Sequence, residues 1–213
     1  MRLPLLLFFA SILITVSSCK KDPLSYKIEG VISDLISNEH ITNVKVKLYK
    51  KVYTNNILSN NYNFISEVNT DNNGHYAFEI PRERLYEVKI EIQDDNYYSK
   101  TLIYNSESLN SAGIIYFNET LEAKSWLTII LENPFVGPDE TLNINKQNFK
   151  EGCEDCCLNG NSSFFETGDT TFTCAVVGGA EIELNYGVAG SSSGFNKLIT
   201  CTPFDTTYFT IKY

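Results

Sequence analysis

The sequence predicts an all-β protein, with two tandem antiparallel β-sandwich domains behind an N-terminal export segment. Three observations predict this class. Tyr, Phe, Val, Ile and Thr, which favour strands, recur in short runs where apolar and polar side chains alternate. Clusters of Asn, Asp and Gly separate these runs and are typical of turns. No stretch of useful length has apolar residues at the i, i+3, i+4 spacing of an amphipathic helix.

The first 18 residues have the composition of a secretory signal. Arg2 supplies a positive charge, residues 3–16 are almost entirely apolar, and two serines follow. A membrane-spanning helix needs roughly 20 apolar residues, whereas this run is shorter and contains Pro4. We therefore expect residues 1–18 to be removed as a signal peptide. Their removal from the 213-residue chain leaves 195 residues, and the loss of Arg2 changes the net charge from −9 to −10.

Val16-Ser17-Ser18-Cys19 resembles a lipobox, the four-residue signal of bacterial lipoproteins. In that signal the cysteine thiol takes a diacylglycerol group, and small residues before it leave room for the peptidase. Each buried methylene contributes about 0.8 kcal/mol, so that stable anchoring needs more than one acyl chain. The resemblance implies a lipoprotein signal peptide, lipidation of Cys19 and a lipidated tether over residues 19–25. An ordinary secreted protein is the alternative.

Lys20-Lys21-Asp22 resembles, incompletely, the signals that send lipoproteins to the outer surface of some Gram-negative bacteria. Those signals usually carry more than one acidic residue, and here Pro23 follows a single Asp. We expect an outer-membrane lipoprotein of the cell envelope, and both a surface-exposed and a periplasmic-facing orientation stay open. The negative charge repels nucleic acid, which we exclude as a partner.

A first β-sandwich is predicted over residues 26–120. Apolar side chains occupy alternate positions in residues 44–48, 76–80 and 88–92. Such alternation places one face of a strand on a core and the other in water, as in antiparallel sheets. Asp71-Asn72-Asn73-Gly74 separates two such runs, and we expect a hairpin turn there because Asn and Gly tolerate positive φ.

Residues 26–34 and 41–48 resemble the opening of carboxypeptidase regulatory-like domains, which belong to the transthyretin-like and Cna-B-like group of seven-stranded sandwiches. The most specific part of the resemblance is Thr70-Asp71-x-x-Gly74-x-Tyr76-x-Phe78, and residues 86–88 extend it. The resemblance implies this fold and an accessory role as a stalk, spacer or docking surface. Some Cna-B-like domains form a Lys–Asn isopeptide bond. We do not expect one here, because no first-strand lysine on the apolar face has a matching internal Glu.

A second β-sandwich, braced by disulfides, is predicted over residues 121–213. Residues 134–139 are expected to form a loop, and Gly178-Gly179 is expected to form a two-residue hairpin. Asn133-Pro134-Phe135 and Phe204-Asp205-Thr206-Thr207 resemble the C-terminal part of uncharacterised bacterial lipoproteins, a family without an established activity. Strands are expected at 126–131, 171–177, 181–186 and 206–213.

The cysteines of the second domain are the disulfide candidates: Cys153, Cys156, Cys157, Cys174 and Cys201. Their odd number predicts two bridges and one free thiol, because an exported chain can form disulfides. We expect Cys174 to pair with Cys201, and Cys153 to meet Cys156 or Cys157 or to leave one of them free. Zinc is the weaker interpretation, since a zinc site needs four ligands and neither histidine falls in this domain. A redox Cys-x-x-Cys motif should open a helix, and none is predicted.

No other pattern predicts catalysis, a metal site or a cofactor. His75 lies beside a turn, and the chain has no Gly-x-Ser-x-Gly elbow to accompany it. The acidic residues near Asp71 and Asp94 are expected to belong to ordinary turns. A calcium site is the alternative, although their spacing does not fit an EF-hand loop. Residues 187–194 are glycine- and serine-rich but lack the lysine of a phosphate-binding loop.

The sequence thus predicts a non-catalytic envelope lipoprotein that acts as a binding or accessory module. The expected partners are the membrane, through lipidated Cys19, and an envelope protein or a glycan. A glycan- or polymer-binding surface protein is one alternative, and it predicts a strip of exposed aromatic side chains. A hydrolase is the other, and it predicts a concave pocket with converging titratable groups. Six tyrosines look exposed and could offer aromatic contact area, but we expect them to fill a sandwich face and its rim: Tyr49, Tyr53, Tyr62, Tyr97, Tyr98 and Tyr104.

Overall fold

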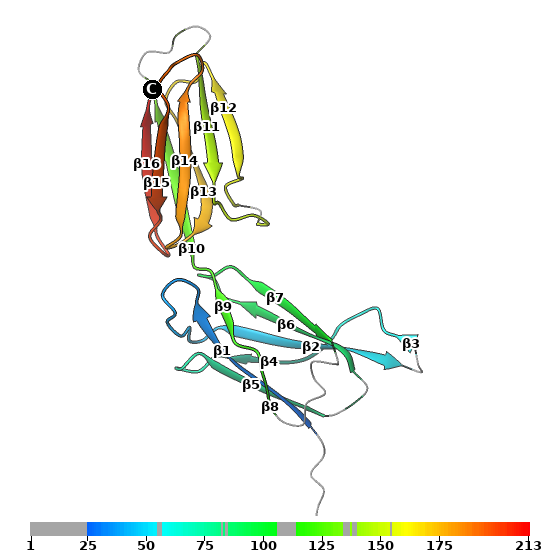
Figure 1. Ribbon diagram of the computed structural model, residues 1–213. Coiled ribbons are helices and arrows are strands. Elements are labelled where there is room, and N and C mark those ends of the chain that lie inside the picture. The colour runs from blue at the N-terminus through cyan, green and yellow to red at the C-terminus, as the bar shows by residue number, and fades with distance from the viewer. Residues whose placement is uncertain are drawn as a thin grey trace, which may run out of the picture.

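The computed structural model describes residues 25–54, 57–81, 83, 85–105, 114–133, 137, 140–153 and 155–213 (Figure 1). The predicted signal peptide, Cys19 and the Lys20-Lys21-Asp22 signal lie outside the described residues, as does most of the expected loop at 134–139. Within the described part of the chain, no helix is long and apolar enough to cross a membrane.

Every described element is a strand, which confirms the all-β class. The strands form four sheets in two stacks, which lie end to end (Figure 1). The N-terminal stack contains β1 (Ser25–Asp34), β2 (Lys45–Thr54), β3 (Ile57–Leu58), β4 (Asn63–Asn69), β5 (His75–Pro81), β6 (Leu85–Gln93), β7 (Lys100–Asn105), β8 (Ile114–Tyr116) and β9 (Glu119–Leu121). The C-terminal stack contains β10 (Lys124–Glu132), β11 (Thr141–Gln147), β12 (Gly160–Phe165), β13 (Thr170–Val177), β14 (Glu181–Val188), β15 (Phe195–Thr200) and β16 (Thr206–Lys212).

Each stack encloses a hydrophobic core between its two sheets. The alternation predicted for β2, β5 and β6 is confirmed, because the apolar positions of all three strands are buried. The buried members of the first core are Ile28, Ile32, Ile41, Val44, Val46, Leu48, Tyr76, Phe78, Ile80, Leu85, Val88, Ile90, Ile92, Ile115 and Leu121. Those of the second are Leu127, Ile129, Leu131, Leu142, Ile144, Phe149, Cys157, Val176, Ile182, Leu184, Cys201 and Ile211.

The two stacks share one strand order. In the N-terminal stack β1 lies between β5 and the β8–β9 segment, and the facing sheet runs β4-β2-β6-β7, with β3 paired to the end of β2. In the C-terminal stack β10 lies between β13 and β16, and the facing sheet runs β12-β11-β14-β15. Each stack is therefore a sandwich in which the first strand is central and the last strand returns beside it. The division into two separate domains at residues 120 and 121 stays a prediction.

The sheets are not purely antiparallel as expected. β8 and β9 run parallel to β1, and β16 runs parallel to β10. The physical reason is the connectivity of the sandwich: the last strand of each stack arrives from the facing sheet and enters the first sheet in the direction of its first strand. All other strand pairs between the described elements are antiparallel.

Two predicted hairpins are instead connections between sheets. The Asp71–Gly74 turn joins β4, which pairs with β2, to β5, which pairs with β1. Gly178-Gly179 joins β13, which pairs with β10, to β14, which pairs with β11. The turn chemistry was recognised correctly, since Gly74 and Gly179 have φ of 70° and 80°. Local sequence does not show which partner the flanking strands choose, and the hairpin prediction was therefore wrong.

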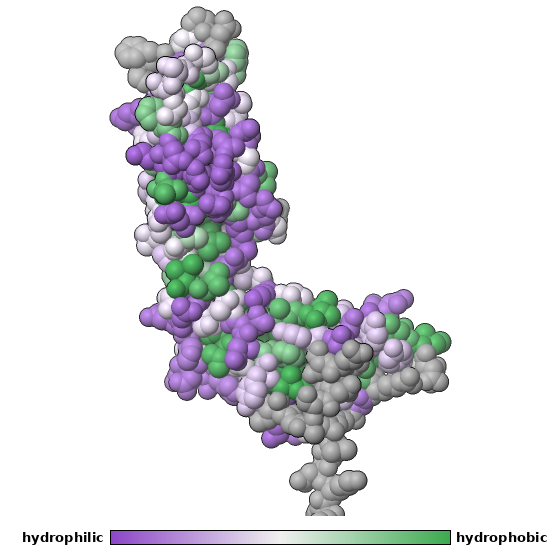
Figure 2. All heavy atoms as spheres, in the orientation of Figure 1, coloured by the Kyte–Doolittle hydropathy of each residue, from purple (hydrophilic) through white to green (hydrophobic). Residues whose placement is uncertain are grey.

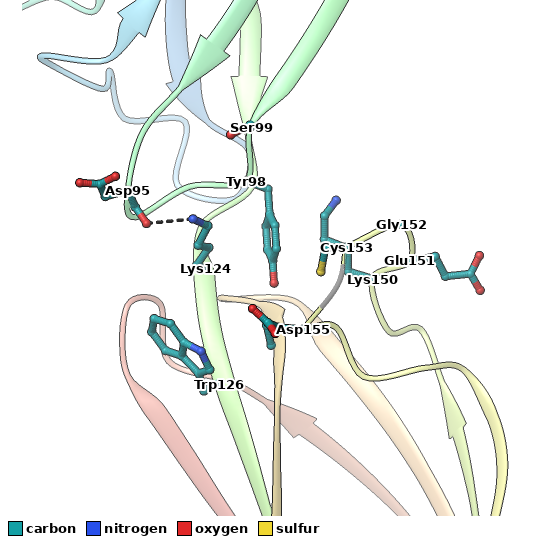
Figure 3. Close-up of a pocket in the computed structure, with 11 residues that line it drawn as sticks. Asp95, Tyr98, Ser99, Lys124, Trp126, Lys150, Glu151, Gly152, Cys153 and Asp155 are labelled. Carbon is teal, nitrogen blue, oxygen red and sulfur yellow. Dashed lines mark hydrogen bonds between the residues drawn. The ribbon is translucent and has the colours of Figure 1, made fainter.

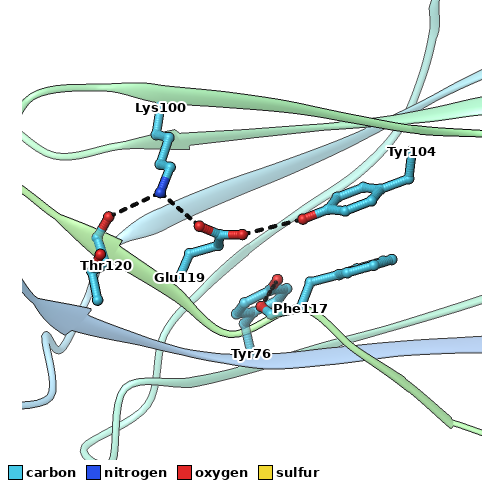
Figure 4. A network of polar contacts seen from close by, with 6 residues as sticks. All are labelled: Tyr76, Lys100, Tyr104, Phe117, Glu119 and Thr120. Atoms are coloured by element: carbon cyan, nitrogen blue, oxygen red, sulfur yellow. Dashed lines mark hydrogen bonds and ion pairs between the residues drawn. The ribbon is translucent and has the colours of Figure 1, made fainter.

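A polar network closes one edge of the N-terminal stack (Figure 4). The Lys100 Nζ of β7 donates to Glu119 Oε2 of β9 at 2.6 Å, and the Tyr104 hydroxyl donates to Glu119 Oε1 at 3.2 Å. The Tyr104 ring stacks on Phe117, whose carbonyl accepts the Tyr76 hydroxyl at 2.8 Å. These contacts tie the last strand of one sheet to the edge of the other.

Candidate binding cleft between the two stacks

The junction between the stacks is short and hydrogen-bonded. Only Glu122 and Ala123 separate β9 from β10. The Glu122 carbonyl accepts the Tyr98 N–H from the N-terminal stack at 2.9 Å, and the Ala123 carbonyl accepts the Gly178 N–H from the C-terminal stack at 2.9 Å. Both residues of the connection are therefore held by strand-like backbone bonds, and they cannot act as a free hinge without breaking them.

Tyr98 is a buried side chain between the two stacks. It lies in the turn between β6 and β7, is only 9% exposed, and packs against Ala175 and Cys156 of the C-terminal stack. Its hydroxyl donates to the Val176 carbonyl at 3.1 Å. Burial, reinforced by the charges of Glu122 and Asp155, raises the pKa of Tyr98 to about 12. The phenol is thus a neutral donor at physiological pH.

Further contacts surround Tyr98. The Tyr97 ring meets Phe204 of the C-terminal stack edge to face, with centroids 5.3 Å apart. Lys150 lies over the Tyr98 ring, with its Nζ 4.7 Å from the centroid, and forms an ion pair with Glu122. An ammonium over an aromatic face contributes about 0.5–1 kcal/mol at partly exposed sites.

A cleft of about 530 Å³ opens beside this junction (Figure 3). Side chains of both stacks line it, and Figure 3 shows the Tyr98 ring pointing from the β6–β7 turn toward the C-terminal stack. Trp126, the single tryptophan of the chain, lines the cleft from β10 of the C-terminal stack and is 39% exposed. The lining residues are Asp95, Tyr98, Ser99, Lys124, Trp126, Lys150, Glu151, Gly152, Cys153, Asp155 and Ala175.

Both lysines of the cleft are engaged in structural contacts. Lys124 Nζ donates to the Asp95 carbonyl at 3.0 Å, which ties the base of β10 to the β6–β7 turn. Lys150 is held by Glu122 and by the Tyr98 ring. The cleft therefore offers an indole, a tyrosine and mixed charges, an arrangement that fits ligand binding by contact and hydrogen bonding.

The disulfides agree with the prediction in number and in one bridge, Cys153 to Cys156, and differ from it in the partner of Cys174. The structure joins Cys153 to Cys156 and Cys157 to Cys174, and Cys201 is a free, fully buried thiol. The expected Cys174–Cys201 bridge was wrong because the segment that contains Cys156 and Cys157 runs along β13. The Cys157 N–H donates to the Ala175 carbonyl at 3.2 Å, and this contact brings Cys157 to Cys174.

Cys201 lies in the core of the C-terminal stack, in the link from β15 to β16. Its carbonyl accepts the Gly179 N–H at 2.7 Å, which fixes the link against the β13–β14 crossing. Burial raises the pKa of its thiol, and the Thr207 hydroxyl opposes this shift. The thiol is therefore protonated and shielded.

The remaining candidates have structural roles. His75 is 39% exposed on β5, with its Nε2 3.7 Å from Glu29 Oε2. The Asp71 carboxylate accepts the backbone N–H groups of His75 and Asn73, which lower its pKa. Asp94 accepts the N–H of Asn96 in the same manner. Among the described residues, no group of three or more His, Cys, Asp or Glu side chains could hold a metal ion.

The six tyrosines that look exposed in the sequence are partly or fully buried, which agrees with the interpretation that they fill a sandwich face and its rim. Tyr98 is buried, and Tyr49, Tyr53, Tyr62, Tyr97 and Tyr104 are half-buried. The aromatic side chains that are exposed do not form one strip, because no described sheet carries more than two of them. They are Phe64, Tyr116, Trp126, Phe165, Phe195, Phe204 and Tyr208.

Sequence reasoning missed the cleft because its residues lie far apart in the chain. In the sequence Tyr98 resembles the other tyrosines that look exposed, and Trp126 appears only as part of a strand, so neither residue indicates a cleft. Alternation along residues 124–132 places Trp126 opposite the buried Leu127, Ile129 and Leu131. An outward-facing indole next to the predicted domain boundary was the available signal.

Comparison with known proteins finds no matching family profile and no matching curated protein. Among solved structures the chain is similar to the Bacillus anthracis TIE protein, with 14% identity and a TM-score of 0.38 over 89% of this chain and 34% of that one. A streptococcal ancillary pilin gives 10% identity and a TM-score of 0.36 over 90% and 62% of the two chains. The 3-chlorocatechol 1,2-dioxygenase of Rhodococcus opacus gives 12% and 0.34 over 46% and 59%. The chain spans less than two thirds of each, and likeness at this level carries no argument about function.

Proposed function

We propose that this protein is a non-catalytic lipoprotein of the cell envelope that acts as a binding and spacing module. In this proposal Cys19 carries the lipid anchor, and two β-sandwich domains extend from the tether. The lipobox-like Val16-Ser17-Ser18-Cys19 supports the address. The observation that carries the spacing role is the junction, where the buried Tyr98 and a two-residue connection couple the stacks.

The geometry of the junction supports a spacer more than a mobile linker. Two residues of the β6–β7 turn contact the C-terminal stack: the Tyr97 ring packs on Phe204, and the Tyr98 hydroxyl donates to the Val176 carbonyl. Flexible linkers between domains are usually exposed and make few contacts. A chain coupled in this way can hold the far stack at a fixed distance from the tether.

The arrangement of the stacks supports the same role. Figure 1 shows them end to end, with the last residue at the end of the C-terminal stack that is remote from the N-terminal stack. A membrane anchor before β1 would place the C-terminal stack farther from the lipid surface. The surfaces of that stack would then be accessible to an envelope protein or a glycan.

Fractionation of cells that express the native precursor tests this function. The wild-type protein should sediment with membranes, and Cys19→Ala should release it or leave an unprocessed precursor. Protease added to intact, outer-membrane-permeabilised and lysed cells then separates surface from periplasmic exposure. Recovery of the wild-type chain in the cytosolic fraction, protected from protease until lysis, would overturn the proposal.

A further inference from the structure

The outer face of the sheet β12-β11-β14-β15 carries a row of asparagines. Asn145 of β11 is in register with Asn161 of β12 and with Asn185 of β14, and Asn185 is in register with Asn196 of β15. Cross-strand partners point to the same face, so all four amides lie side by side across the sheet. Four strands about 4.8 Å apart give a row about 14 Å long, the length of a short oligosaccharide.

A shallow groove of about 440 Å³ covers this row. Asn143 extends the amide surface on β11, and Ser191 and Ser193 line the groove from the β14–β15 loop. The loop lies close to the sheet at Gly187, where a Cβ atom would be 3.0 Å from the Ser193 carbonyl oxygen. In the face that Figure 2 shows, hydrophilic residues gather over the middle of the C-terminal stack.

The amides hold one another in place but keep hydrogen-bonding capacity. Asn145 Nδ2 donates to Asn161 Oδ1 at 2.7 Å, and Asn196 Nδ2 donates to Asn185 Oδ1 at 2.7 Å. Each amide has two N–H donors and an oxygen with two acceptor sites. The bonds in the row, including those that Asn185 and Asn196 donate to Glu183, use fewer than half of these groups.

The equivalent face of the N-terminal stack is built differently, although the strand order is the same. There β2 and β6 present lysines and glutamates that form ion pairs, such as Lys51 with Glu87 and Lys89 with Glu91. In the C-terminal stack the positions on β11 are Asn143, Asn145 and Gln147. Charged side chains on the outer face of a sheet commonly keep that face solvated. Uncharged amides replace such charges along β11 and across the row, while β14 keeps Glu183 beside it.

The chemistry of the groove fits a neutral polyhydroxyl ligand. None of the described residues that line it carries a charge. Amide and hydroxyl groups exchange hydrogen bonds in both directions without the desolvation cost of an ion. Tyr186 and Phe195 stack on the opposite, core-facing side of the sheet, since Tyr186 is in register with the buried Ile144; amides and hydroxyls, and not an aromatic ring, therefore face the ligand. An anionic polymer would be repelled by a chain with net charge −9.

We infer that this groove binds a neutral glycan chain, with the asparagine row forming hydrogen bonds to the ring hydroxyls. The inference rests on the proposed binding role and specifies its ligand class. Its test is independent of the cellular address. Failure to reach the envelope would sink the proposed function, whereas failure to bind glycan would sink only this inference.

The experiment uses the mature protein extracted from membranes in a polyoxyethylene detergent, which contains no sugar. Isothermal titration measures binding to neutral gluco-, manno-, galacto- and xylo-oligosaccharides, with uronic-acid oligosaccharides as the charged comparison. We expect binding to at least one neutral series and none to the uronic acids. Binding to none of the neutral series, or preference for uronic acids, would overturn the inference.

Variants locate the site. The double variant N145A/N185A should weaken binding at least tenfold, because it removes the two central amides. The matched control is N69A, which removes an exposed amide that donates to Asn43 Oδ1 on the N-terminal stack and should leave binding unchanged. If the double variant does not fold, the side-chain amide signals of the row in the wild-type nuclear magnetic resonance spectrum should shift on titration. Unchanged binding in a folded double variant, or unshifted signals, would contradict the assignment.

Discussion

Replacement of Tyr98 by alanine should destabilise the protein and uncouple the two stacks. The hydroxyl bond to the Val176 carbonyl contributes about 1 kcal/mol. Truncating a buried aromatic side chain costs about 3–5 kcal/mol, and the interfacial position of Tyr98 points to the lower end of that range. About 3 kcal/mol corresponds to a fall in Tm of about 6–12 °C for a chain of this size. Tyr98→Phe keeps the ring and should lose about 1 kcal/mol.

Trp126 provides the assay. As the single tryptophan it reports on the C-terminal stack and on the cleft, whereas far-ultraviolet circular dichroism reports on both stacks. In Tyr98→Ala the two signals should give separate urea transitions, since the stacks no longer unfold together. Tyr208→Ala is the matched control: that tyrosine is 68% exposed, and its loss should change the free energy of unfolding by less than about 0.5 kcal/mol. Equal stability of Tyr98→Ala and Tyr208→Ala would refute the role assigned to Tyr98.

Three further predictions follow from single sites. Gly30→Ala should lower the free energy of unfolding by about 3 kcal/mol in urea denaturation, because its Cβ would lie 2.0 Å from the Phe117 carbonyl oxygen. The control is Gly137→Ala, whose Cβ would have its nearest atom at 3.9 Å and which should leave the stability nearly unchanged. Equal effects of the two substitutions would contradict the packing at Gly30. Cys201 should resist maleimide in the native state and react once urea unfolds the chain, whereas rapid native labelling would contradict its burial. Burial raises the pKa of Tyr98 and of Tyr104 to about 12, above the usual value of 10. The stability from these tyrosines should therefore be complete below pH 10 and fall as the pH rises toward 12. The tyrosinate absorbance that Tyr98→Phe or Tyr104→Phe removes should increase together with unfolding; ionisation of either tyrosine near pH 10 without unfolding would refute this.

The inward faces of the strands could be predicted from the sequence because alternation is a local property. Val44, Val46 and Leu48 are buried while their neighbours are not, as a strand of period two requires. Glycine and asparagine likewise mark the turns, since positive φ is a local demand. In the Thr-Asp-x-x-Gly-x-Tyr-x-Phe stretch, Gly74 meets this local demand with its φ of 70°, and a contact with a distant strand requires glycine as well. A Cβ at Gly74 would lie 2.5 Å from the Ile32 carbonyl oxygen.

Strand partners could not be predicted, because they depend on contacts between distant segments. The turns at Asp71 and Gly178 looked like hairpins, yet each joins strands of different sheets. The same limit produced the wrong cysteine pairing, since strand-like surroundings for Cys174 and Cys201 do not show which loop runs beside β13.

The candidate groove and the Tyr98 contact likewise depend on which strands pair and in which register. The asparagines of the groove are scattered over 54 residues of sequence, from Asn143 to Asn196, and each one alone indicates only a solvent-facing position or a turn. The pairing of β12, β11, β14 and β15 brings them into one row. Tyr98 similarly gains its role from the approach of β13, which its own neighbourhood in the sequence does not reveal.

The mass of the N-terminal peptide tests the central claim, an envelope lipoprotein anchored through Cys19, most directly. The wild-type protein is purified from membranes, digested, and examined by mass spectrometry, with Cys19→Ala as the control. The account predicts a chain that begins at Cys19 and carries a diacylglycerol thioether with a further acyl group on its amine. A chain that retains residues 1–18, or that begins at an unmodified residue and is recovered free of membranes, would contradict it.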